Sequence, residues 1–181
     1  MKKIMFNDKY GLTQAVLEGR KTQTRRTFLK PGEETLFDGI TPEYLISVRS
    51  RYKVGETVAI AQSYADITPQ VDWVKCMIRK ETLGWNNKMF VRAEDMPHHI
   101  RITKIRIERL QDIKSEDCLN EGLWRAGDVG LEGTTYWYHG LSNSSFRTPQ
   151  EAYASLIDRI SGKGTWVNNP YVFVYDFELI D

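Results

Sequence analysis

The sequence predicts an α+β fold, with mostly antiparallel strands and about three flanking helices. Two segments, 100–110 and 171–179, alternate apolar and polar residues as half-buried strands do. A third segment, Thr-Pro-Gln-Glu at residues 148–151, is a capping box with proline at the first helical position. The chain has 181 residues, of which 41% are hydrophobic, so it can bury one substantial core. We therefore expect a single domain over residues 1–181.

The first elements lead into a basic segment. Residues 2–6 are expected to form a short strand, and Asp8 to cap a helix over residues 9–18. The apolar residues of that helix recur at helical spacing, and Gly19 supplies the left-handed conformation that commonly ends a helix.

The middle of the chain alternates connections and short elements. Within the long connection 31–54 we expect a helix over residues 43–48, followed by a buried strand over the β-branched run 57–61. Residues 64–99 form an insertion, in which we expect short strands near 73–78 and 89–91. After the strand at 100–110, Ser115 is expected to cap a helix that stops at Gly122.

The last third contains a second insertion and two well-defined elements. Residues 125–147, rich in Gly, Ser, Asn, Tyr and Trp, are expected to form a long loop. The capped helix that follows should end at Gly162, and a loop over 166–170 should lead to the final strand. That strand, 171–179, has aromatic residues on its predicted inner face.

Residues 20–30 hold five lysines or arginines and no acidic residue. Such a run can simply keep an exposed loop or edge strand soluble. Alternatively, its cations and the hydroxyls of Thr22 and Thr24 converge on a phosphate or a polar substrate. A desolvated Lys21 can also act as a base toward the hydroxyl of Thr24. Since these two residues would face opposite sides of a plain strand, a joint role predicts a turn or bulge there.

Charge, cysteine and histidine content restrict the partners. Lys and Arg number 25 against 24 acidic residues, so contact with a nucleic acid would have to come from a local patch. Cys76 and Cys118 provide no disulfide framework, which is typical of the reducing cytoplasm. His98 and His99 point opposite ways on a strand, so we expect no bound metal. No apolar run has the length of a signal peptide core or a membrane span.

Six segments together resemble the ASCH domain of phage and prophage proteins. The first is the signature Gly-x-Lys-x-x-x-x-Arg, met by Gly19, Lys21 and Arg26. The others follow in the same order as in that family: Val-Gly-Glu at 54–56, Met-Pro at 96–97, Ile-Glu-Arg-Leu-Gln-Asp-Ile at 107–113, Glu-Gly at 121–122 and Asn-Pro-Tyr-Val at 169–172.

This resemblance implies a PUA-like β-barrel of about five to seven strands, with a cleft for RNA or a modified nucleoside or nucleotide. Some compact ASCH proteins are amidohydrolases that remove the acetyl group of N(4)-acetylcytidine. Their catalytic residues correspond to Lys21, Thr24 and Glu121 of this sequence. Threonine would attack the amide carbonyl while lysine takes its proton, and glutamate would orient the groups or protonate the leaving amine. Arg26 would stabilise the oxyanion or bind the sugar.

Ligand contacts are expected from the basic segment, from the second basic strand and from the aromatic cluster of the second insertion. These residues are Arg20, Thr22, Arg25, Arg26, Arg101 and Trp137. Trp137 would either stack on a base or pack against the barrel.

Three functions remain open at this point. The first is a nucleotide- or RNA-binding module with a basic cleft around residues 21–26. The second is an amidohydrolase acting on acylated nucleosides. The third is a phage accessory protein that binds a protein partner through an exposed apolar patch. None of the three calls for a cofactor.

Overall fold

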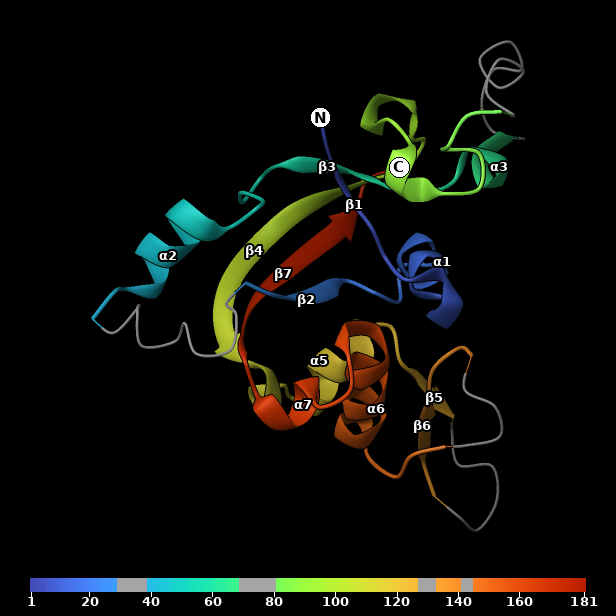
Figure 1. Ribbon diagram of the computed structural model, residues 1–181. Helices are drawn as coiled ribbons and strands as arrows, with labels where there is room; N and C mark the ends of the chain where they lie inside the picture. Colours follow the sequence, from blue (N-terminus) through green and yellow to red (C-terminus); the bar gives the residue numbers. More distant parts are fainter. Residues whose placement is uncertain (29–38, 69–80, 127–132, 141–144) are drawn as a thin grey trace.

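The computed structural model describes residues 1–28, 39–68, 81–126, 133–140 and 145–181 (Figure 1). It shows an α+β fold, as predicted, with a five-stranded sheet and a separate two-stranded sheet. The large sheet has the order β1-β3-β4-β7-β2. Its strands are β1 (Lys2–Ile4), β3 (Thr57–Ile60), β4 (His99–Arg109), β7 (Tyr171–Leu179) and β2 (Gln23–Thr27).

The pairing in this sheet is antiparallel except between β1 and β3, which run parallel. Strands β1 and β2 have no further partner, so hydrogen bonding among the described strands leaves two edges and does not close the sheet. Because β2 is an edge strand, its backbone pairs with another described strand on one side only.

Strand β7 lies at the centre of the sheet, between β4 and β2. Its predicted inner face, which includes Phe173 and Tyr175, is buried. Val172 and Val174 on the opposite face are buried as well, because helices cover that side of a central strand. The core therefore extends over both faces of β7.

The helices gather around the sheet, with α5, α6 and α7 grouped together (Figure 1). Helix α6 (Pro149–Ser161) has the predicted capping box, in which the Thr148 hydroxyl accepts from the Glu151 N–H. The other α-helices among the described residues are α1 (Leu12–Leu17), α2 (Pro42–Arg49), α3 (Tyr64–Ile67), α5 (Ser115–Asn120) and α7 (Thr165–Asn168).

The predicted helix over 9–18 is divided at Gly11. A 3₁₀ turn, η1 (Asp8–Tyr10), precedes α1, and Gly11 between them has a φ of 64°. The cap is Asn7, whose side chain accepts from the N–H of Lys9. Asp8 instead accepts a hydrogen bond from the Thr13 hydroxyl, 2.5 Å away. The prediction that Asp8 is the cap was therefore wrong by one residue.

Several other segments have a secondary structure that differs from the predicted one. Residues 88–90 form the 3₁₀ helix η4 (Lys88–Phe90) rather than a strand, and α7 replaces a predicted loop. The second insertion is not all loop, since β5 (Trp124–Ala126) pairs with β6 (Thr135–Trp137). Ser115 is the first residue of α5 and does not cap it. The predicted strand near 73–78 and Cys76 lie outside the described residues.

Candidate functional site

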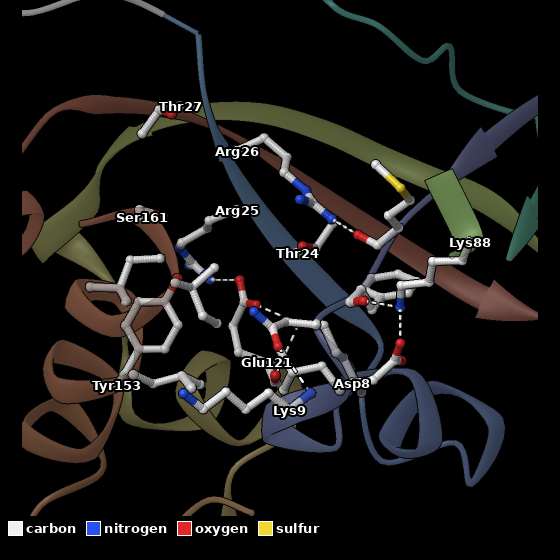
Figure 2. A pocket seen from close by; sticks show the side chains of 18 residues that line it. Asp8, Lys9, Thr24, Arg25, Arg26, Thr27, Lys88, Glu121, Tyr153 and Ser161 are labelled. Carbon is white, nitrogen blue, oxygen red and sulfur yellow. Dashed lines mark hydrogen bonds and ion pairs between the residues drawn. The ribbon is translucent and has the colours of Figure 1, made fainter. Parts of the chain in front are cut away.

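A pocket with a volume of about 600 Å³ lies beside the edge strand β2 (Figure 2). Its walls come from the segment after β1, from β2, from the end of α5 and from α6. The lining includes all three predicted catalytic residues, Lys21, Thr24 and Glu121, together with Arg25 and Arg26. Residues a hundred positions apart in the sequence thus meet in one cavity.

The turn that follows α1 positions Lys21. Gly19 has a φ of 72°, as predicted for a helix-ending glycine, and the Lys21 N–H donates to the Ala15 carbonyl at 2.9 Å. Strand β2 begins only at Gln23. Lys21 therefore precedes the strand and Thr24 lies within it, so the alternation of a plain strand does not separate them, and both line the same pocket.

The ammonium group of Lys21 is enclosed by acceptors. Its Nζ donates to the carbonyl oxygens of Gln23 and Glu121, at 2.7 and 2.9 Å, and to Glu121 Oε2 at 2.6 Å. The residue is only 2% exposed. Burial lowers the pKa of Lys21, the carboxylate of Glu121 opposes this, and the charges of Arg26 and Arg25 add to the lowering.

Glu121 occupies the end of α5, where it forms the helix cap. Its two carboxylate oxygens are divided between two cations, since Oε2 accepts from Lys21 and Oε1 accepts from Arg25 at 3.2 Å. The next residue, Gly122, has a φ of 98°, and a Cβ there would lie 3.2 Å from the Ala15 Cβ. A glycine is therefore required for α5 to turn away this close to α1.

Arg25 is buried within a network of carboxylates. Besides Glu121 it pairs with Glu108 at 3.2 Å and Asp117 at 3.3 Å, and it donates to the Gln23 side chain. Its Nε is buried without a hydrogen-bond partner among the described residues. Taking such charges out of water is costly unless every charge is compensated. Lys21 and Arg25 are thus neutralised by the protein itself and are not free to bind an anion.

Two hydroxyl groups complete the inner wall. Thr24 is 4% exposed and Tyr153, from α6, is 2% exposed. Neither side chain forms a hydrogen bond with another described residue, and both line the pocket. Burial, followed by the negative charge of Glu121, raises the pKa of Tyr153 well above its usual value, so its hydroxyl stays protonated. The pocket therefore offers hydroxyl groups that a ligand can satisfy.

The rim of the pocket carries further charges, one of which the sequence did not reveal. Arg26 is exposed and donates to the Met5 carbonyl at 2.5 Å. Lys88 pairs with Asp8 at 2.7 Å and also donates to the Phe6 carbonyl (Figure 2). No sequence pattern surrounds Lys88, and Tyr153 was recognisable only as part of a buried helical stripe.

The other predicted ligand-binding residues lie outside this pocket. Arg20 pairs with Glu18 at 2.7 Å and stacks its guanidinium on Trp124 at 3.7 Å. Trp137 is 36% exposed and stacks on the same Trp124 ring, with 5.3 Å between ring centroids. Thr22 faces a separate hollow, and Arg101 pairs with Glu178 on the surface of the sheet.

The described residues contain no group of three or more His, Cys, Asp or Glu side chains arranged to hold a metal ion. None of their helices has the length and apolar character needed to cross a membrane. Cys118 is a buried free thiol, and burial raises its pKa to about 12.

Comparison with known proteins adds little to this description. No family model matches the chain, and no curated protein matches it. Among solved structures it is similar to protein EF3133 from Enterococcus faecalis V583, described by the family model DUF984. That alignment covers 100% of this chain and 77% of the other, with 14% identity and a TM-score of 0.42. A likeness at this level carries no argument about function.

Proposed function

We propose that this pocket binds a nucleoside or nucleotide and that Lys21, Thr24 and Glu121 hydrolyse an N-acyl group on its base. The observation that carries the proposal is the meeting of these three residues in one cavity. Its volume of about 600 Å³ lies within the range of small-molecule sites. In this proposal the chain is a member of the ASCH family. Its sheet corresponds to a PUA-like barrel, and the pocket lies between the two edge strands, β1 and β2.

The chemistry begins with Lys21 in its neutral form. Its ammonium passes one proton to the Glu121 carboxylate, which already accepts a 2.6 Å hydrogen bond from it. The neutral amine then takes the hydroxyl proton of Thr24 as the oxygen attacks the amide carbonyl. The lysine ammonium returns that proton to the leaving amine, and an acyl ester of threonine remains. Water then attacks the ester carbonyl as the same amine takes its proton, and the lysine ammonium returns that proton to the departing Thr24 oxygen, which releases the carboxylic acid.

Two features of the site support this sequence of steps. Burial lowers the pKa of Lys21, which favours the neutral amine that a base requires. The Thr24 hydroxyl has no hydrogen-bond partner among the described residues, so it is available to attack. Arg26, on the rim of the same pocket, supplies a positive charge for the oxyanion or the sugar.

A second candidate function is binding without turnover. It is favoured by the three hydrogen bonds of Lys21, which use every donor of a charged ammonium. In that case the lysine and Glu121 form a structural ion pair, and the pocket recognises a nucleotide through its hydroxyls and Arg26. Binding should then weaken with salt and in Arg26→Ala.

The test is hydrolysis of N(4)-acetylcytidine, followed by chromatography. Thr24→Ala should lower kcat by roughly 10³-fold or more, because it removes the nucleophile. Thr22→Ala provides the matched control, since it deletes the same hydroxyl two residues away and outside the pocket. Thr24→Ser should retain part of the activity.

Equal turnover by Thr24→Ala and the unchanged protein would contradict the hydrolase. If the unchanged protein binds cytidine but releases no acetate from N(4)-acetylcytidine, binding without turnover is supported instead. Calorimetry of cytidine binding, performed on the same samples, separates these results.

A further inference from the structure

A second pocket adjoins the first on the other side of Arg26. Its volume is about 410 Å³, and it shares Met5, Arg26 and Thr27 with the first pocket. Its other walls are the end of β1, the start of the segment after α2, and β7. The two pockets are therefore neighbours, and Arg26, which donates to the Met5 carbonyl, lines both of them.

The lining of this second pocket is cationic. Arg26, Arg49 and Arg51 line it, and no aspartate or glutamate does. Arg26 and Arg51 are both exposed, and neither has a carboxylate partner among the described residues. Most other arginines with described contacts have a carboxylate beside them: Arg20, Arg25, Arg92, Arg101 and Arg106. Arg26 and Arg51 are therefore the arginines of this pocket that an anionic ligand can reach without displacing a described carboxylate.

Aromatic side chains form its inner wall. Phe28 is half-buried and stacks on Phe173, with 4.0 Å between ring centroids. Tyr52 packs edge-on against Tyr175, at 5.2 Å between centroids. The hydroxyls of both tyrosines are already engaged, by the Lys3 carbonyl and the Ser50 hydroxyl. The anchoring polar groups of this pocket are therefore its arginines.

We propose that the second pocket binds the phosphate of a nucleotide whose base occupies the first pocket. This inference rests on the proposed function of the first pocket. Guanidinium groups suit phosphate because several N–H donors meet its oxygens at once. Among the described residues Arg26 donates a single hydrogen bond, to the Met5 carbonyl, so its other donors remain for a ligand that crosses from one pocket to the other.

The phosphate has two possible sources, which have the same chemistry. It is either the terminal phosphate of a mononucleotide or a phosphodiester of a ribonucleotide strand. In both cases a free nucleoside fills only the first pocket and binds more weakly. The natural substrate would then be phosphorylated or part of a strand.

The test measures binding by calorimetry at 50 mM salt. The probes are cytidine, cytidine 5′-monophosphate, cytidine 3′-monophosphate and the dinucleotide CpU. The unchanged protein should bind at least one phosphate-bearing probe tenfold or more tightly than cytidine. Arg51→Gln should remove that advantage and leave the affinity for cytidine unchanged within about twofold, since Arg51 does not line the first pocket. Arg92→Gln, which deletes an exposed arginine beside Asp95, is the matched control and should keep the full advantage.

Each outcome has a distinct meaning. A gain with a monophosphate supports a mononucleotide, and a gain with CpU alone supports a strand. Equal affinity for cytidine and all three phosphate-bearing probes overturns the inference but leaves the first pocket intact. If Arg51→Gln still binds a phosphate-bearing probe tenfold more tightly than cytidine, the phosphate does not lie in the second pocket. If phosphate-bearing probes bind through Arg51 while cytidine does not bind, the anion site stands and the proposed function of the first pocket fails.

Discussion

At the scale of single residues, Lys21 and Glu121 determine the chemistry of the pocket. Their ion pair is almost fully buried, and Glu121 also compensates Arg25. A buried pair of this kind contributes little net stability compared with apolar residues, yet removing one partner leaves an uncompensated charge. The two residues are therefore coupled in stability as well as in the proposed reaction.

We expect Glu121→Gln to destabilise the protein by about 3–5 kcal/mol, because Lys21 then keeps only neutral acceptors. The double variant Lys21→Met/Glu121→Gln should recover part of that loss, since Arg25 still pairs with Asp117 and Glu108. Urea unfolding of the two single variants and the double variant measures the coupling. Additive losses would show that the pair is not coupled.

Cys118 provides a prediction for alkaline pH. The folded protein holds the thiol pKa at about 12, against a usual 9.0, because of burial. The unfolded chain therefore ionises first, so the stability from Cys118 is fully present below pH 9 and is lost as pH rises toward 12. Cys118→Ala should reduce the slope of unfolding free energy against pH by up to about 1.4 kcal/mol per pH unit in that range. Identical slopes for both proteins from pH 9 to 11 would refute the assignment.

At the scale of elements, the junction of α5 and α1 holds the site together. Gly122 lets α5 end against α1, with a hypothetical Cβ 3.2 Å from Ala15 and 3.4 Å from the Lys21 Cβ. This close approach is what brings Glu121 onto the lysine. The geometry of the ion pair therefore depends on the turn as much as on its two charges.

Gly122→Ala should destabilise the protein by more than about 1 kcal/mol, because it combines an unfavourable positive φ with crowding. Gly55→Ala is the control, since Gly55 has a φ of 83° but no atom within 4 Å of the added Cβ. Thermal unfolding should show a larger decrease in Tm for Gly122→Ala. Equal decreases would mean that crowding against α1 has no effect.

Elements with strong local signals could be predicted from the sequence. The capping box and apolar stripe specified α6, and the alternation of residues specified β4 and β7. The hairpin β5–β6 could not be recognised, because its strands have three residues each and no alternation. Helix α7 has four residues, too few for a helical period to be visible.

At the scale of the whole molecule, the five-stranded sheet and the two-stranded sheet differ in stability. Strand β7 is paired on both sides and buried on both faces, whereas β5 pairs with β6 alone among the described strands, and β6 has one further bridge, from Tyr136 to Phe146. Amide protons of β4 and β7 should exchange only on global unfolding, at least 10³-fold more slowly than those of β5 and β6. Hydrogen exchange with mass spectrometry tests this difference, and equal rates in the two sheets would contradict it.

Only part of the site could be predicted from the sequence. Lys21, Thr24 and Glu121 were identified through a resemblance to a family signature, and the structure places them together. The carboxylates around Arg25 were not foreseen, because Glu108 and Asp117 reach it through sheet and helix packing, which leaves no local pattern in the sequence. The same holds for Lys88, whose nearest partners lie near the start of the chain.

The pairing of β2 with β7 also affects how the protein is made. Gln23 lies opposite Asp176, and β7 is the only one of the described strands that pairs with β2. A nascent chain on the ribosome has therefore exported the basic segment long before its partner strand exists. Until residues 171–179 emerge, Lys21 and Arg25 can neither be enclosed nor held beside a finished sheet. We expect partly synthesised chains to lack the pocket and to depend on chaperones that shield an unpaired strand edge.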